Sequence, residues 1–182
     1  MYNAPQQMGP ANLLYAEPTG YRATMVCFPY DDLTGWRGPY PPTVFAEQFE
    51  KVAQGWAEGL RHFEKAVNAS TGERHAAAVS DLSVAQAVHL HFASVANQVR
   101  FVLARDALSQ PNASDEQRQQ LREQIRQLTE SEISLARKLF AVTNQDSRIG
   151  YEASNHYFYV PLDLVEKVIN CEFISDRFAV RK

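Results

Sequence analysis

An unbroken heptad pattern of apolar side chains in the second half of this 182-residue chain constrains its fold more than any other feature. The pattern consists of Leu121, Ile125, Leu128, Leu135, Leu139 and Val142, with Glu132 in the one remaining position. Alternating spacings of four and three predict a long helix with a single apolar seam. Ser114 and Gln117 have the spacing of a capping box, so we expect this helix to begin at Ser114.

Two further long helices are predicted before this one. The first covers about residues 43–68, and the second covers about residues 71–109, where Ser70 and Glu73 have capping-box spacing and Pro111 ends the pattern. Helices of this length extend roughly 40 to 60 Å, and short connections make neighbouring helices antiparallel. The predicted fold class is therefore all-α, with an antiparallel three-helix bundle over residues 43–145.

The segments on either side of the predicted bundle differ from it in composition. Residues 1–42 hold seven of the nine prolines together with many aromatic residues, which predicts an irregular strap packed on the bundle, with a strand candidate over residues 21–28. Residues 146–182 begin with a turn-rich crossing segment and continue into a short helix from Pro161 to Cys171. We expect these parts to form one domain.

Composition and motifs exclude several classes of function. A net charge of −3 and a pI near 6.0 argue against nucleic acid and anionic lipid as partners. The sequence shows no apolar run of membrane-spanning length and no secretion-signal pattern in its first 20 residues. Two cysteines, dispersed histidines and the lack of a phosphate-binding or nucleophile motif predict no metal and no cofactor.

Glu132 is the most unusual residue of the predicted seam, because an apolar side chain is expected there. A buried carboxylate needs an ion-pair or hydrogen-bond partner, and Arg100 on the preceding helix is the partner that the sequence suggests. The alternative is that Ile133 and Ala136 share the burial and that Glu132 lies at the solvent edge of the seam.

Residues 28–40 combine aromatic and charged side chains in a loop that prolines make stiff. Tyr30, Asp31, Asp32, Trp36 and Arg37 are candidate ligand-binding residues, since aromatic rings stack on sugars while charged groups hold the hydroxyls. The alternative is that the aromatic rings cover one end of the bundle while the two aspartates cap turns.

Residues 146–157 form a second polar segment. Arg148 and Asn155 are candidate ligand-binding residues, and Glu152 with His156 would form an acid and base pair on one face if the segment were helical. The alternative is a buried polar network that fixes a non-helical crossing to the bundle.

These segments carry a resemblance. The runs G-P-A-N-L-L-Y, T-G-Y-R-A-T-M-V-C-F-P-Y-D-D-L, D-S-R-I-G-Y-E-A-S-N-H-Y-F-Y and P-L-D-L-V-E-K-V-I-N-C are similar to the C-terminal region of large, poorly characterised bacterial proteins described as glycoside-hydrolase-like. The similarity covers residues 9–171 but only the tail of such proteins. It implies an upstream catalytic barrel, which needs about 250 residues. The location of the parent protein stays open, with secretion and the periplasm as its candidates.

Two functions follow as expectations, and a third is weaker. The resemblance implies a helical accessory portion of a carbohydrate-active protein, incomplete as a catalyst, with a carbohydrate and the upstream catalytic domain as partners. The alternative is a free-standing helical interaction or structural module that forms oligomers at micromolar concentration. An independent enzyme using Glu152 and His156 is the third. Exposure of Leu13, Leu14, Tyr15, Trp36 and Tyr40 would favour the accessory portion, and their burial would favour the free-standing module.

Overall fold

The computed structural model describes residues 9–22, 31–150 and 159–179. Its helices are α2 (Leu33–Trp36), α3 (Pro42–Ala69), α4 (Gly72–Leu108), α5 (Asp115–Gln145) and α6 (Pro161–Phe178). These described ranges contain no strand, which confirms the predicted all-α class. The strand candidate at residues 21–28 lies largely outside them.

The ends of the long helices follow from local chemistry. The capping box that starts α5 is confirmed, since the Gln117 backbone N–H donates to Ser114 Oγ at 3.2 Å and the Ser114 N–H donates to Gln117 Oε1 at 2.9 Å. The capping box predicted at Ser70 is wrong, because Ser70 Oγ donates instead to the carbonyl oxygen of Val67 at 2.6 Å. Ser70 therefore closes α3, and Thr71 precedes α4.

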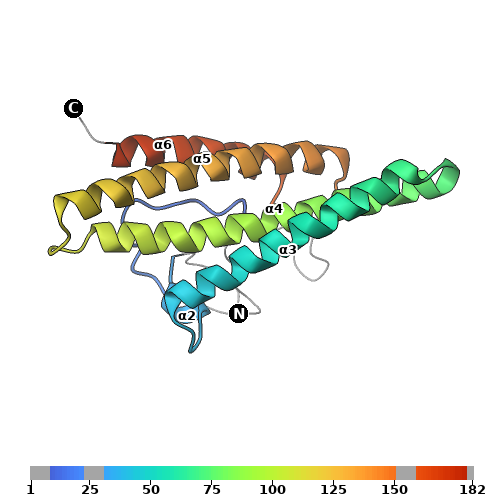
Figure 1. The fold of residues 1–182 in the computed structure, drawn as a ribbon. Helices are drawn as coiled ribbons and strands as arrows, with labels where there is room; N and C mark the ends of the chain where they lie inside the picture. The colour runs from blue at the N-terminus through green and yellow to red at the C-terminus, as the bar shows by residue number, and fades with distance from the viewer. Residues whose placement is uncertain (1–8, 23–30, 151–158, 180–182) are drawn as a thin grey trace.

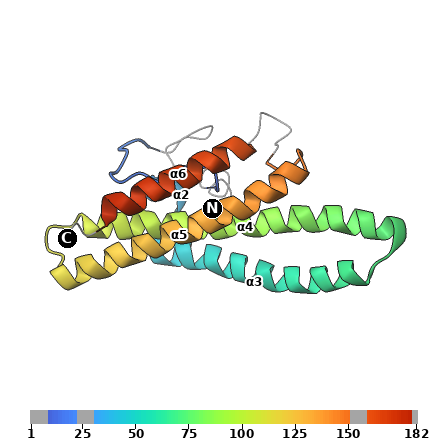
Figure 2. The ribbon, with the colours of Figure 1, turned by 90° about the horizontal axis from the view of Figure 1, so that it is seen from above.

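Consecutive long helices run in opposite directions (Figure 1). Packing joins α3 to α4, α4 to α5 and α5 to α6, so the helices associate as successive pairs. The α3–α4 hairpin reaches well beyond the end of α5 and α6, as the view from above also shows (Figure 2). The last helix is longer than the sequence predicts, since it continues to Phe178 and adds a fourth long helix to the expected three.

The core lies where α4 passes between its neighbours. Its larger cluster joins Phe45 and Phe49 of α3 to Val99 of α4, Ile125 of α5 and Ile174 of α6. A smaller cluster forms around Leu90, Leu139, Ile149, Tyr159 and Leu164. Most of the predicted α5 seam is buried or half-buried, whereas Val52 and Trp56 of the predicted α3 stripe are about 40% exposed.

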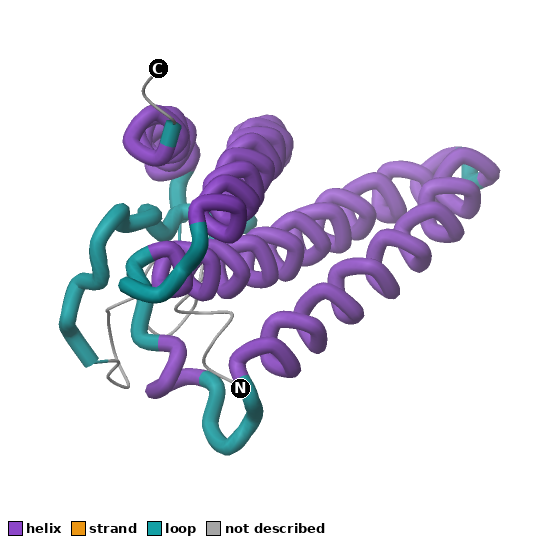
Figure 3. Tube along the Cα trace, turned by 60° about the vertical axis from the view of Figure 1, so that its left-hand side comes forward, coloured by secondary structure: helices purple, strands orange, loops and turns teal. Residues whose placement is uncertain are grey.

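Residues 9–22 of the N-terminal segment form no helix or strand and lie against the long helices, and the short helix α2 follows later in the segment. Leu14 is buried in the larger cluster, Leu13 and Tyr15 are half-buried, and Tyr40 is exposed. This mixture of buried and exposed side chains favours neither the accessory portion nor the free-standing module. The side chain of Trp36 lies outside the described part of the chain. Figure 3 shows α6 at the edge of the molecule, with helical neighbours on one side only.

Candidate functional site

The outer face of α6 carries a continuous apolar stripe. Leu162, Val165, Ile169 and Phe173 follow one another at spacings of three, four and four, which places them on one face of the helix. Their exposed fractions are 74%, 40%, 62% and 63%. Single exposed apolar residues are ordinary, but a row of them on one helix is typical of a surface that binds another protein.

Acidic side chains border this stripe. Glu166 and Glu172 lie on its two sides by helical position, Asp176 lies at its C-terminal end, and all three are exposed. Arg177 is the basic residue closest to the stripe. The apolar row is therefore set in a negatively charged border.

The opposite face of α6 is buried and contains a charged residue. Leu164, Cys171 and Ile174 belong to the core, and Lys167 lies in the same row with no exposed side-chain area. Lys167 Nζ lies 3.1 Å from Glu132 Oε2 of α5, and it also donates to the carbonyl oxygen of Asn12. The surrounding apolar residues raise the pKa of the Cys171 thiol to about 12, mainly through burial.

Glu132 is the acceptor at the centre of this buried network. Ser94 Oγ of α4 donates to Glu132 Oε2 at 2.8 Å, and Asn97 Nδ2 donates to Glu132 Oε1 at 2.9 Å. The predicted Glu132–Arg100 pair is wrong, because Arg100 pairs with Glu50 of α3 at 2.6 Å. The solvent-edge alternative is wrong too, since Glu132 is only 2% exposed.

Sequence reasoning missed Lys167 although a signal was present. Leu164, Lys167, Cys171 and Ile174 recur at spacings of three, four and three, so Lys167 occupies an apolar seam position just as Glu132 does. Two opposite charges in two separate seams suggest that they face each other. The requirement that a buried charge has an oppositely charged partner would have indicated Lys167, as well as Arg100, as a candidate partner of Glu132.

Polar side chains on α6 and α4 also hold the N-terminal segment through its backbone. Asn170 accepts from the Leu14 N–H at 2.7 Å and donates to the Leu14 carbonyl oxygen at 2.9 Å. Gln98 Nε2 donates to the Gly9 carbonyl oxygen at 2.5 Å. Rotation of α6 about its axis would break the contacts of both Lys167 and Asn170, so the network fixes which face of α6 points outward.

Asp31 and Asp32 make contacts within the chain. Asp31 Oδ2 lies 2.9 Å from Arg105 Nη1, in a pair whose side chains are 7% and 1% exposed, and both Asp31 oxygens accept from Thr19. Burial alone would raise the pKa of Asp31, but the hydrogen bonds from Thr19 and Arg105 outweigh it and lower that pKa. Asp32 caps α2 by accepting from the Gly35 N–H at 3.1 Å.

Arg37 and Arg148 also bind neighbouring groups. Arg37 Nη1 donates to the Tyr40 carbonyl oxygen at 2.7 Å, and Arg148 pairs with Asp146 and donates to Ser80 Oγ. The α4 residues that contact Asp31 and Arg148 are Arg105 and Ser80, which are about 38 Å apart along the helix. The structure thus separates Asp31 from Arg148 instead of bringing them into one site.

The remaining predicted site residues lie outside the described part of the chain. They are Tyr30, Glu152, Asn155, His156 and the side chain of Trp36. Among the residues that are described, no three His, Cys, Asp or Glu side chains are grouped as a metal site would require. None of the described helices combines the length and apolar character needed to cross a membrane.

The described residues define an all-helical protein in which buried contacts of Lys167 and Asn170 orient an apolar face of α6 outward. Comparison of the chain with models of known families, with curated proteins and with solved structures finds no match.

Proposed function

We propose that this protein is a helical interaction module whose outer α6 face docks an amphipathic helix with basic flanks. The observation that carries the proposal is the exposed row of Leu162, Val165, Ile169 and Phe173. A helix with its own apolar row would remove this area from water, which is the main favourable contribution to most protein associations.

The charges around the stripe support a basic partner. Glu166, Glu172 and Asp176 would meet Lys or Arg residues of the partner helix, which steers encounter and fixes orientation. A second copy of the same face would instead bring like charges together around the stripe. The surface therefore favours a different protein or domain over self-association.

The accessory role implied by the resemblance is compatible with this proposal. In a glycoside-hydrolase-like parent, the upstream domain would supply the basic amphipathic helix, and α6 would attach the helical tail to it. The contacts of Asp31, Asp32 and Arg37 within the chain give no independent support to a carbohydrate partner.

Binding of a designed peptide tests the proposal. The probe is a labelled helical peptide of leucine and lysine with all leucines on one face, and fluorescence anisotropy measures its affinity. The double variant Ile169→Gln, Phe173→Gln should weaken binding by more than about tenfold, because it removes the centre of the stripe. The control is Val79→Gln, Val84→Gln on α4, which removes two exposed apolar residues elsewhere, with exposed fractions of 44% and 46%.

The charge requirement has its own control. A peptide with glutamate in place of every lysine should bind far more weakly, since it would face the acidic border of the stripe. Equal binding by wild-type protein and the α6 double variant would contradict the proposal. Concentration-dependent dimers in sedimentation that the same α6 variant abolishes would identify a second copy as the occupant.

A further inference from the structure

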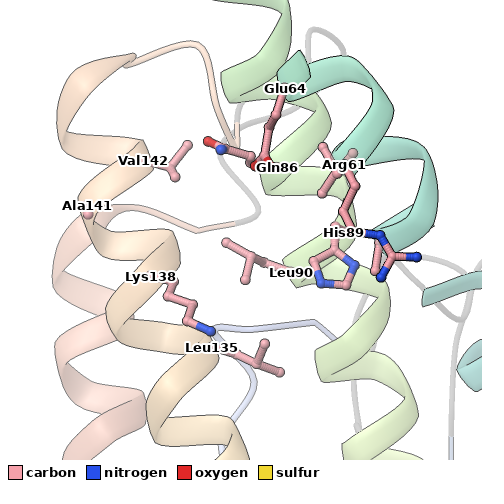
Figure 4. A pocket seen from close by; sticks show the side chains of 11 residues that line it. Arg61, Glu64, Gln86, His89, Leu90, Leu135, Lys138, Ala141 and Val142 are labelled. Atoms are coloured by element: carbon pink, nitrogen blue, oxygen red, sulfur yellow. The ribbon is translucent and has the colours of Figure 1, made fainter. Parts of the chain in front are cut away.

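A cavity of about 460 Å³ lies between α3, α4 and α5, away from the α6 stripe (Figure 4). It forms because α3 and α5 both pack on α4 but not extensively on each other, which leaves a space between them. This volume lies within the range of small-molecule sites.

The cavity has an apolar lining. Leu60 comes from α3, Leu90 from α4, and Leu135 with Val142 from α5. In Figure 4, Leu90 lies in the middle of the space, between the side chains of the two outer helices. No Phe, Tyr or Trp is among the lining residues, so the cavity lacks the broad aromatic surface on which a sugar ring stacks.

Charged groups from opposite walls complete the site. Arg61 of α3 and Lys138 of α5 line it together with one carboxylate, that of Glu64. Within the described part of the chain, the side chains of Arg61 and Lys138 form no hydrogen bond or ion pair with another residue. Two cations against one anion leave a single positive charge over an apolar lining, which complements one negative charge on an apolar ligand.

His89 occupies the wall beside Arg61 in a defined orientation (Figure 4). Its Nδ1 lies 3.2 Å from the Ala53 carbonyl oxygen, and because a carbonyl only accepts, Nδ1 is the donor. This bond ties the imidazole to the backbone of α3. The orientation of the His89 ring in this wall is therefore fixed before any ligand arrives.

We propose that this cavity binds a small amphiphilic monocarboxylate, with the apolar body against the leucines and the carboxylate attracted by the positive charges of Arg61 and Lys138. This site is distinct from the α6 stripe in both its residues and its ligand class. It gives the protein a small-molecule binding activity in addition to the interaction proposed above.

Calorimetric titration of the full chain with decanoate tests the proposal, and decanol is the neutral control with the same tail. We expect saturable binding of one decanoate, with decanol weaker by about tenfold, since decanol cannot pair with either cation. Arg61→Gln and Lys138→Gln should each weaken decanoate binding by about three- to fivefold, and the double variant by more than about tenfold. Arg137→Gln removes an exposed charge next to Lys138 but outside the lining, and it should leave the affinity within about twofold.

Three results would overturn the proposal. They are the absence of saturable decanoate binding, equally tight binding of decanol, and unchanged affinity in the Arg61→Gln, Lys138→Gln double variant. Circular dichroism of each variant verifies that it is folded, which is expected because both substituted side chains are exposed. The Ile169→Gln, Phe173→Gln variant should bind decanoate normally, which separates this site from the α6 surface.

Discussion

At the scale of single residues, the ion pair between Lys167 and Glu132 is the feature on which the position of α6 depends. Both side chains are at least 98% buried, and the network satisfies them with hydroxyl, amide and carbonyl partners. A buried pair of this kind adds little net stability over apolar residues, but removal of one partner is costly because the other charge stays buried. The network therefore acts chiefly by making other orientations of α6 unfavourable.

Lys167→Met should lower the free energy of unfolding by about 3 to 5 kcal/mol, because Glu132 then remains buried without its cation. Glu132→Leu should have a similar cost for the converse reason. The double variant should recover most of the loss, and urea unfolding of all four proteins measures the coupling. The control is Arg126→Gln in the exposed pairs with Glu123 and Glu130, which should change stability by less than about 1 kcal/mol. Additive effects of the two buried substitutions would contradict this interpretation.

The Asp31–Arg105 pair should make the free energy of unfolding depend on pH. The pKa of Asp31 is lowered in the folded protein from its ordinary value of 3.8, so the carboxylate stabilises the fold above about pH 4. This contribution is lost as the pH falls through the lowered pKa. The difference in unfolding free energy between wild type and Asp31→Asn should therefore be larger at pH 7 than at pH 3, as urea unfolding at both values would show. A difference that is independent of pH would exclude Asp31 as the titrating group.

Cys171 should be chemically inert in the native protein. Its pKa of about 12 and its complete burial keep the thiol protonated and inaccessible to reagents. In a Cys27→Ser background, reaction with Ellman's reagent at pH 8 should occur only as fast as the protein opens, and urea should accelerate it strongly. Rapid labelling in the absence of urea would show that α6 separates from the core under native conditions.

At the scale of elements, periodicity located the long helices well but did not show how each helix is rotated about its own axis. The predicted segments 43–68 and 71–109 differ by one residue at each end from α3 and α4. The heptad seam and the Ser114 cap define α5 through local spacing alone. The partner of Glu132 could not be obtained in this way, because it depends on how α5 and α6 are rotated relative to α4.

The length and the outer face of α6 show a second limit of sequence patterns. Residues 172–178 carry no stop signal, and Ile174 and Phe178 extend the buried row, so the helix continues beyond Cys171. This helix has apolar residues on both faces, and periodicity does not show which face is buried. The position of Lys167 shows which face of α6 is buried only once its partner on α5, Glu132, is known.

The backbone geometry of the turn after α5 predicts how glycine substitutions affect stability. Gly150 has φ of +88°, and a Cβ at this position would overlap the Tyr159 carbonyl oxygen. Gly150→Ala should therefore destabilise the protein by more than Gly38→Ala, which also has positive φ but meets no neighbouring atom. The control should cost about 1 kcal/mol, and thermal unfolding of both variants measures the difference. Equal effects would mean that the turn relaxes away from Tyr159.

At the scale of the whole molecule, the two proposed sites lie on different sets of helices. The α6 stripe depends on the α4–α5–α6 network, whereas the cavity depends on the divergence of α3 from α5. The sequence suggested an interaction module only as an alternative, and its ligand candidates concentrated on loops where aromatic and charged residues cluster. The described residues of those loops bind their own chain, because Arg105, the α2 backbone and Asp146 already satisfy them.

Nuclear magnetic resonance mapping of the basic amphipathic peptide on the labelled protein tests the central claim most directly. The account predicts that amide shifts at saturation concentrate on residues 161–178, with the largest changes around Ile169 and Phe173. It also predicts that residues of the distal α3–α4 hairpin remain unchanged. Shifts concentrated on that hairpin, or none at α6 with a saturating peptide, would contradict the assignment of the outer α6 face as the docking surface.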